Sequence, residues 1–251
     1  MSMIALYLRS NLRRIFALIA FAMLFLLSGL TARLLVGTDH GQVELGNLFM
    51  AGGYPLVAAL LLLGWMLGRY ALVATLVMFA GIVSSDRANG NIRLYAVRPR
   101  WVGFLYLKKF FAAGAVVFVL SALLMPTFDM LLLGRWAGAG TFVLILSYIM
   151  VYGSVCFFLS VWLRGEVWIT VVLAITAMLW DALIRSGKIG NAAPGIREIV
   201  TVLLPPQSAL FQIESAFGAE NPIPWASFVF VMAYAVILTV AALVSLRIRE
   251  L

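Results

Sequence analysis

The sequence predicts an all-α integral membrane protein with six transmembrane helices and both termini in the cytoplasm. The first observation is composition: of 251 residues, 64% are hydrophobic and only 11% are charged, whereas a typical soluble domain has about 25% charged residues. The second is that six apolar runs reach the length of about 20 residues that a helix needs to cross the hydrocarbon core. The third is that most Lys and Arg residues fall on one side once these runs are threaded through a membrane.

Each apolar run is expected to be a helix, because backbone amide groups in hydrocarbon have to bond to one another. Together the runs form a single transmembrane domain over 1–251. Before the first run, the basic and apolar residues of 1–14 predict an interfacial helix on the cytoplasmic surface; a simple basic flank is the alternative. The six predicted spans are 15–36, 55–84, 102–124, 141–163, 167–183 and 225–246.

The distribution of basic residues predicts the orientation of these spans. If both termini and the loops 84–109 and 164–166 lie on one side, that side carries 12 of the 18 Lys and Arg residues but only three acids. Such an excess of basic residues is typical of cytoplasmic loops. The membrane is most simply a bacterial cytoplasmic (inner) membrane. The net charge of +8 then reflects topology, and no nucleic-acid partner is expected.

The chain offers few residues for catalysis or for metal binding. One Cys and one His exclude a disulfide within the chain and leave no ligand set for zinc or haem. The sequence also lacks the G-x-x-x-x-G-K-[ST] loop that binds nucleotide phosphates. We therefore expect no catalytic, cofactor-binding or metal site on this chain, and no ATP hydrolysis by it.

The segment 184–224, between the fifth and sixth spans, is apolar but interrupted by Pro205 and Pro206. It is too broken to form a full span. We expect one or two short re-entrant helices, which enter the outer leaflet partway and return, with their non-helical backbone covered by protein. A plain amphipathic loop on the membrane surface is the alternative.

The stretch SSDRANGNIRLYAVRPRWVGFLYLKK, residues 84–109, places six basic residues between two apolar runs. Asn89–Gly90 is a turn signal, about two helical turns follow, and Pro99 ends them. Asp86 is expected at a helix C-terminus, where the macrodipole disfavours an acid. That position indicates either a helix break or a partner such as Arg87. A rigid, basic and partly apolar knob of this kind suits docking into a groove on another protein.

This stretch resembles the integral-membrane subunits of type-2 ATP-binding-cassette (ABC) exporters. In that family the long second span ends in a motif of the form acid-Arg-acid-x-Gly-Thr-Leu-x-Leu-Leu-x-x-x-Pro, and a basic segment ending in Gly-Lys follows. This chain has Asp86-Arg87-Ala88-Asn89-Gly90-Asn91-Ile92-Arg93-Leu94-Tyr95, then Arg98-Pro99-Arg100 and Lys108-Lys109. The spacing from Gly90 to Pro99 matches the family, whereas Ala88, Asn91 and Lys108 depart from it.

The resemblance implies a permease subunit with a short cytoplasmic coupling helix within the loop 85–100, seated in a cleft of a separate ATP-binding subunit. Two such ATPase subunits would bind ATP and magnesium. A second copy of the permease, or a related one, would form the transport path with this chain, with Pro205 and Pro206 in the external gate and membrane lipids around the pair. The residues expected at the ATPase interface are Asp86, Arg87, Asn89, Gly90, Ile92, Arg93, Leu94, Tyr95, Arg98 and Pro99.

The expected function is therefore to convert ATP-driven closure of the partner into alternating opening of a path, most simply for export. Two alternatives stay open. One is a non-transporting, mechanotransmitting assembly subunit, since a chain of this shape could pass mechanical work to an external partner. The other is a secondary transporter, although no convincing internal repeat is visible.

Two charged residues lie deep inside the predicted spans. Arg69 is about 22 Å from the cytoplasmic end of the second span at 1.5 Å per residue, and Asp181 lies at a similar depth in the fifth. Charged residues at such depth usually face protein or water and find partners. The sequence predicts either a pair between Arg69 and Asp181 or separate hydration of each.

Overall fold

The computed structural model describes residues 3–36, 38–39, 42–43, 69–89, 102–132, 138–187, 199–201, 203–218 and 222–249. Its main helices are α1 (Met3–Ser10), α2 (Leu12–Val36), α5 (Tyr70–Phe79), α6 (Ser84–Ala88), α8 (Val102–Leu132), α9 (Gly140–Trp162), α10 (Glu166–Arg185), α12 (Gln207–Gly218) and α13 (Trp225–Arg249). The one departure from the predicted all-α class within these residues is a pair of two-residue antiparallel strands, β1 (Thr38–Asp39) and β2 (Gln42–Val43).

Five helical stretches in the described part of the chain are long and apolar enough to cross a membrane. They are Tyr70–Ala88, which includes a short break, and Val102–Phe128, Gly140–Trp162, Glu166–Arg185 and Trp225–Ile248. The chain is thus a helical protein of the kind that is embedded in a membrane. The first predicted span, 15–36, falls within the 25-residue helix α2. Residues 55–68 of the second predicted span lie outside the described residues.

Several elements differ in extent from the sequence prediction. Helix α8 continues past Pro126 to Leu132, whereas the third span was predicted to end at residue 124. The N-terminal segment is not one surface helix, because a turn at Asn11 separates α1 from α2. The second predicted span does not run unbroken to Ser84, because α5 ends at Phe79.

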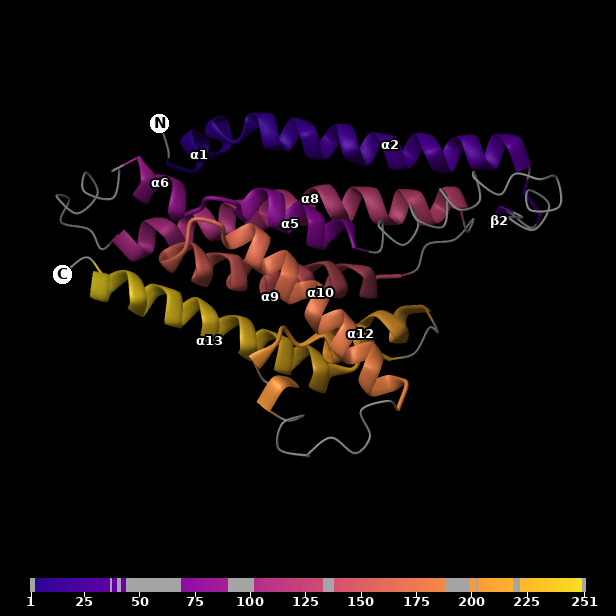
Figure 1. Cartoon of the computed structure of the whole chain (residues 1–251). Helices are drawn as coiled ribbons and strands as arrows, with labels where there is room; N and C mark the ends of the chain where they lie inside the picture. The colour runs from indigo at the N-terminus through magenta and orange to yellow at the C-terminus, as the bar shows by residue number, and fades with distance from the viewer. Residues whose placement is uncertain are drawn as a thin grey trace.

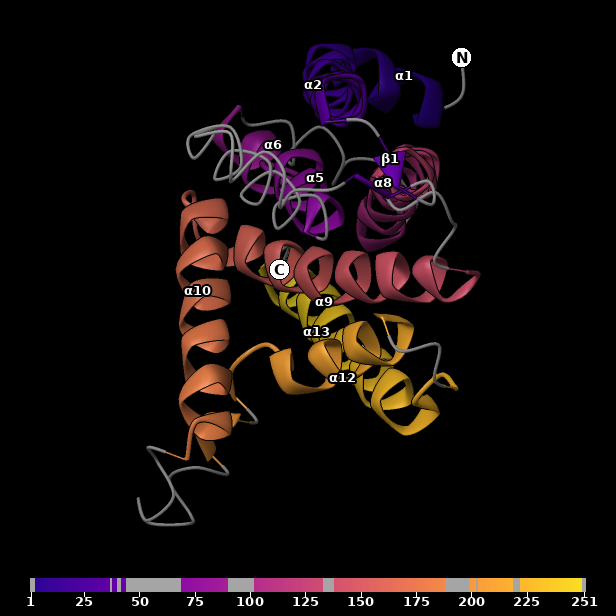
Figure 2. The same cartoon turned by 90° about the vertical axis from the view of Figure 1, so that its right-hand side faces the viewer.

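Helix α9 forms the centre of the bundle. In Figure 2 it lies between a layer of α2, α5 and α8 and a layer of α12 and α13, while α10 runs along one side of the molecule. In α9, 67% of the span is buried, compared with 22% in α10. Gly153 of α9 allows this packing, since an added Cβ there would lie 2.9 Å from the ring of Phe79.

Most of the polar contacts described below lie at one end of the bundle. The start of α1, the helix α6, the start of α8 and the end of α13 all lie at the left of Figure 1, and the strand pair lies at the opposite end. We call the first the loop end, because α6 ends and α8 starts there.

Candidate functional site at the helix break

The chain breaks between α5 and α6, immediately before the predicted docking loop. Ala80 leaves the helix with φ −56° and ψ 122°, and Gly81 has φ +74°, a conformation that favours glycine. An added Cβ on Gly81 would lie 3.3 Å from Cβ of Ser85. Glycine is therefore favoured at this position by its backbone conformation, and an added Cβ would also require a small shift of Ser85.

The break changes the position of Asp86 in its helix. The prediction that Asp86 lies at a helix C-terminus is wrong, because the helix ends earlier, at Phe79, and a new one starts at Ser84. Asp86 lies in the first turn of α6, where an acid is favoured. A helix break was one of the two alternatives that the sequence indicated for Asp86. A break does occur, but it lies earlier, between residues 80 and 83.

Side chains from the N-terminal helices complete the hydrogen bonding at the end of α5. The last carbonyl groups of a helix have no partner within it. Here the hydroxyl of Tyr7 donates to the carbonyl of Met78 at 3.1 Å, and the guanidinium of Arg14 donates to the carbonyl of Ala80 at 2.5 Å. The break is thereby attached to α1 and α2.

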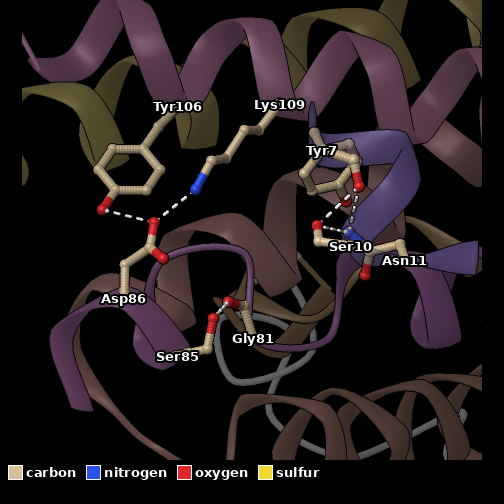
Figure 3. A network of polar contacts seen from close by, with 8 residues as sticks. All are labelled: Tyr7, Ser10, Asn11, Gly81, Ser85, Asp86, Tyr106 and Lys109. Carbon is tan, nitrogen blue, oxygen red and sulfur yellow. Dashed lines mark hydrogen bonds and ion pairs between the residues drawn. The ribbon is translucent and has the colours of Figure 1, made fainter. Parts of the chain in front are cut away.

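The turn between α1 and α2 is held by polar side chains of its own. Ser10 and Asn11 donate to the carbonyl of Tyr7 at 2.8 and 2.9 Å, as Figure 3 shows. Burial raises the pKa of Tyr7 to about 12, although the nearby Arg14 acts in the opposite direction. The Tyr7 hydroxyl therefore stays protonated well above neutral pH, and it can donate the hydrogen bond to the Met78 carbonyl of α5.

A second attachment comes from Glu166, the first residue of α10. One carboxylate oxygen, Oε1, accepts hydrogen bonds from the backbone N–H of Gly81 at 2.6 Å and from the hydroxyl of Ser84 at 2.9 Å. The residue is only 2% exposed. Glu166 is one of the three acids on the predicted cytoplasmic side, and nothing in the sequence reasoning predicted this contact. An acid at the start of a predicted span was the available signal.

Asp86 joins the two ends of the docking loop. Its carboxylate forms an ion pair with Lys109 and accepts a hydrogen bond from the hydroxyl of Tyr106 at 3.2 Å, and Figure 3 shows it facing both side chains. The Lys109 ammonium also lies 5.0 Å from the centre of the Tyr106 ring. Asp86 lies at the start of the loop 85–100 and its two partners follow the end of that loop, so the entry and exit of the loop are bound to each other.

Arg87 is not the partner of Asp86, so the second of the two alternatives that the sequence left open does not occur. Its guanidinium donates to the carbonyl of Val161 at 2.6 Å. That carbonyl lies at the end of α9, where carbonyl groups lack helical partners. The break and α6 are therefore attached to α2, α8, α9 and α10, and we call this set of contacts the junction.

Only three of the predicted interface residues can be placed. Asp86 and Arg87 belong to the junction, and Asn89 is exposed at the end of α6, with its backbone N–H bonded to the carbonyl of Ser85 at 3.0 Å. The remaining interface residues lie outside the described residues: Gly90, Ile92, Arg93, Leu94, Tyr95, Arg98 and Pro99.

The junction is rich in cations. Within it, Arg14, Arg87 and Lys109 face two acids, Asp86 and Glu166. Among the described residues, no group of three or more His, Cys, Asp or Glu side chains could hold a metal ion. The exposed cations near the junction are Arg9, Arg13, Lys108 and Arg164.

The two intramembrane charges do not form the predicted pair. Asp181 instead binds Arg185, which is one turn later in α10, with 2.7 Å between the carboxylate oxygen and the guanidinium nitrogen. Side chains four residues apart on a helix are neighbours, so this pairing requires no contact between helices. Arg69, at the start of α5, lies within electrostatic range of Tyr148 and Tyr152 on α9.

Pro205 and Pro206 are buried, and the chain beside them contacts the middle of α9. The neighbouring Gln207 accepts a hydrogen bond from the hydroxyl of Tyr152 at 2.9 Å. Tyr152 is about 18 Å from the start of α9, at 1.5 Å per residue. A pocket beside the two prolines is lined by Trp180 and Asp181 of α10 and by Phe230 of α13.

In comparisons with known proteins, no family model, no curated protein and no solved structure matches the chain.

Proposed function

We propose that this chain is the permease subunit of an ABC exporter, which works with separate subunits that bind ATP and magnesium and hydrolyse the nucleotide. Closure of those subunits would displace the loop 85–100, and the junction would pass the displacement to the spans. The chain itself would catalyse no reaction. Its transport path would lie between it and a second permease, either the same chain or a related one.

The observation that carries this proposal is the attachment of the loop to several spans at once. Asp86 binds α8, Arg87 binds α9, and the break just before them binds α2 and α10. A loop that only connects two spans needs no such contacts. A loop that receives a force does need them, because coupling between sites is carried by packed and hydrogen-bonded elements that move together.

The proposal includes a topology of six spans, with α2 as the first, in a bacterial inner membrane. The loop end would face the cytoplasm together with both termini. Exposed cations at that end support this orientation: Arg9, Arg13, Lys108, Arg164 and Arg247. The segment around Pro205 and Pro206 would be re-entrant and form the outer gate. Its support is the contact of Gln207 with Tyr152, deep in α9.

The test is co-purification of the full chain from its native membrane in mild detergent, with mass spectrometry of its partners. We expect an ABC ATPase subunit with the wild type and its loss in the double variant Gly90→Pro/Arg93→Glu. Lys188→Glu, a charge reversal in the predicted external segment, serves as the control and should retain the ATPase.

Absence of any ATPase under conditions that preserve membrane complexes would contradict the proposal. Recovery of the ATPase in a complex that has no path across the membrane would favour the mechanotransmitting, non-transporting subunit instead. Circular dichroism of each variant establishes that loss of the partner does not reflect unfolding.

A further inference from the structure

The buried residues of helix α10 lie in a single stripe. Five buried positions, spaced four, four, three and four residues apart, lie on one face of the helix, as a period of 3.6 requires: Glu166, Thr170, Ala174, Ala177 and Asp181. The two end positions carry carboxylates, and the three middle ones are small. The other faces hold large exposed apolar side chains, among them Trp168, Val172, Ile175 and Leu179.

The first end of the stripe is bound to the helix break. Glu166 accepts from the Gly81 N–H and the Ser84 hydroxyl, and both donors belong to the segment that changes direction between α5 and α6. Hydrogen bonds to an ionised acceptor are stronger than those between neutral groups. A displacement of residues 81–84 is therefore transferred to the start of α10.

The second end of the stripe is bound to the Pro205–Pro206 segment. Asp181 holds Arg185 at 2.7 Å, and the Arg185 guanidinium carbon lies 3.7 Å from the centre of the Phe211 ring on α12. On the same turn of α10, the Trp180 indole N–H donates to the hydroxyl of Thr201 at 3.4 Å. These contacts attach α10 to the chain on both sides of the two prolines.

The middle of the stripe holds α10 through small side chains. Ala174 and Ala177 present only methyl groups, with the partly buried Val171 and Met178 packed against the core beside them. The polar contact in this region, 3.4 Å between the Cys156 sulfur and the Thr170 hydroxyl, is weak because a thiol is a weak donor. Because the helix keeps its own backbone hydrogen bonds, it moves as one rigid body rather than by stretching.

We propose that α10 couples the helix break at Gly81–Ser84 to the Pro205–Pro206 segment, with Glu166 and Arg185 as its two attachment points. The attachment points lie about 28 Å apart along the helix, at 1.5 Å per residue. Both are positioning residues, since each acts through the segment that it holds. The purpose of the coupling, control of the outer gate by the docking loop, rests on the proposed function, but the coupling itself is a property of this chain.

The test measures cysteine labelling at one end after the attachment at the other end is weakened. Ser208→Cys reports on the proline segment and Ser85→Cys on the break, since both serines are exposed. The native Cys156 is fully buried, and the chain without either substitution measures its background. The full chain is labelled with a maleimide in lipid nanodiscs, without any partner protein.

We expect Glu166→Gln to raise the labelling rate at position 208 by about threefold or more, and Arg185→Met to do the same at position 85, since each removes a charged attachment. Asp86→Asn is the matched control. It makes the same acid-to-amide change in the junction, but its partners are on α8, so labelling at position 208 should stay at the wild-type rate.

Unchanged rates in both arms overturn the coupling, and so does an equal rise at position 208 in Asp86→Asn, which would indicate general loosening of the junction. If Glu166→Gln does not fold, the Arg185→Met arm decides alone. The assay needs no ATPase, so a protein without an ATPase partner can still show the coupling. Equally, a protein with such a partner can fail to show it.

Discussion

The helix break at the loop end and the segment around Pro205 and Pro206 are held by different chemistry. At the loop end, side chains bind backbone groups that a helix break has exposed, as when Arg14 binds the carbonyl of Ala80. In the proline segment, Pro205 and Pro206 are buried against α10 and α13, and one side-chain pair, Tyr152 with Gln207, provides a buried polar contact near the middle of α9. A break in a long helix leaves polar groups that must be satisfied, so the loop end needs specific partners from several helices. The proline segment depends more on packing.

The largest expected effect comes from removing the central acceptor at the loop end. Glu166→Ala leaves the N–H of Gly81 and the hydroxyl of Ser84 buried without their acceptor, which costs about 3 kcal/mol in unfolding free energy. Thermal unfolding in detergent measures the loss. Arg164→Ala, two residues earlier and exposed, should unfold close to the wild-type temperature; a loss equal to that of Glu166→Ala would mean that the carboxylate has no special role.

A smaller loss is expected when the break itself is strained. Gly81→Ala places a side chain at φ +74° and 3.3 Å from Ser85, at a cost of about 1–2 kcal/mol. Gly165→Ala is the matched control, because its φ is −110° and nothing lies within 4 Å of an added Cβ. If both alanine variants unfold at the same temperature, the break does not depend on glycine.

In the proline segment we expect a comparable but reversible loss. Tyr152→Phe leaves the side-chain oxygen of the buried Gln207 without its donor, at a cost of about 1–2 kcal/mol in unfolding free energy. Adding Gln207→Leu removes the unsatisfied partner and should recover most of the loss in unfolding temperature. Failure of the double variant to recover would show that this segment is also held by specific polar contacts, and the contrast with the loop end would disappear.

The smallest effect concerns Tyr7 and has a pH signature. Tyr7→Phe removes the hydrogen bond to Met78 and should cost about 1 kcal/mol at neutral pH. Because the pKa of Tyr7 is raised from 10.0 to about 12 in the fold, the folded state binds this proton more tightly than the unfolded state. The stabilisation that the protonated Tyr7 hydroxyl gives to the fold is then complete below pH 10 and is lost as the pH rises from 10 to 12. The difference in unfolding temperature between the two proteins should therefore narrow over that interval; a constant difference would contradict this account.

Part of the junction could be foreseen from sequence and part could not. The acid at position 86 signalled that a continuous helix was unfavourable, because its charge would oppose the macrodipole. The choice of Lys109 rather than Arg87 as its partner depends on how α8 returns beside α6, and no local pattern encodes that return. The pair between Arg69 and Asp181, one of the two alternatives that the sequence left open, does not form for a related reason. Matching depth is a necessary condition for contact, but it does not say which faces of the two helices meet.

The helical, membrane-embedded class and the approximate extent of the spans follow from the sequence alone. These properties follow from length and hydropathy, which are sums over neighbouring residues. Only the tertiary structure establishes which backbone groups each polar side chain satisfies, and that α10 contacts the helix break through Glu166 and the ring of Phe211 through Arg185. Those contacts join residues up to 85 positions apart, so they depend on the rotation and crossing of whole helices. Such geometry arises only when all of the helices pack together.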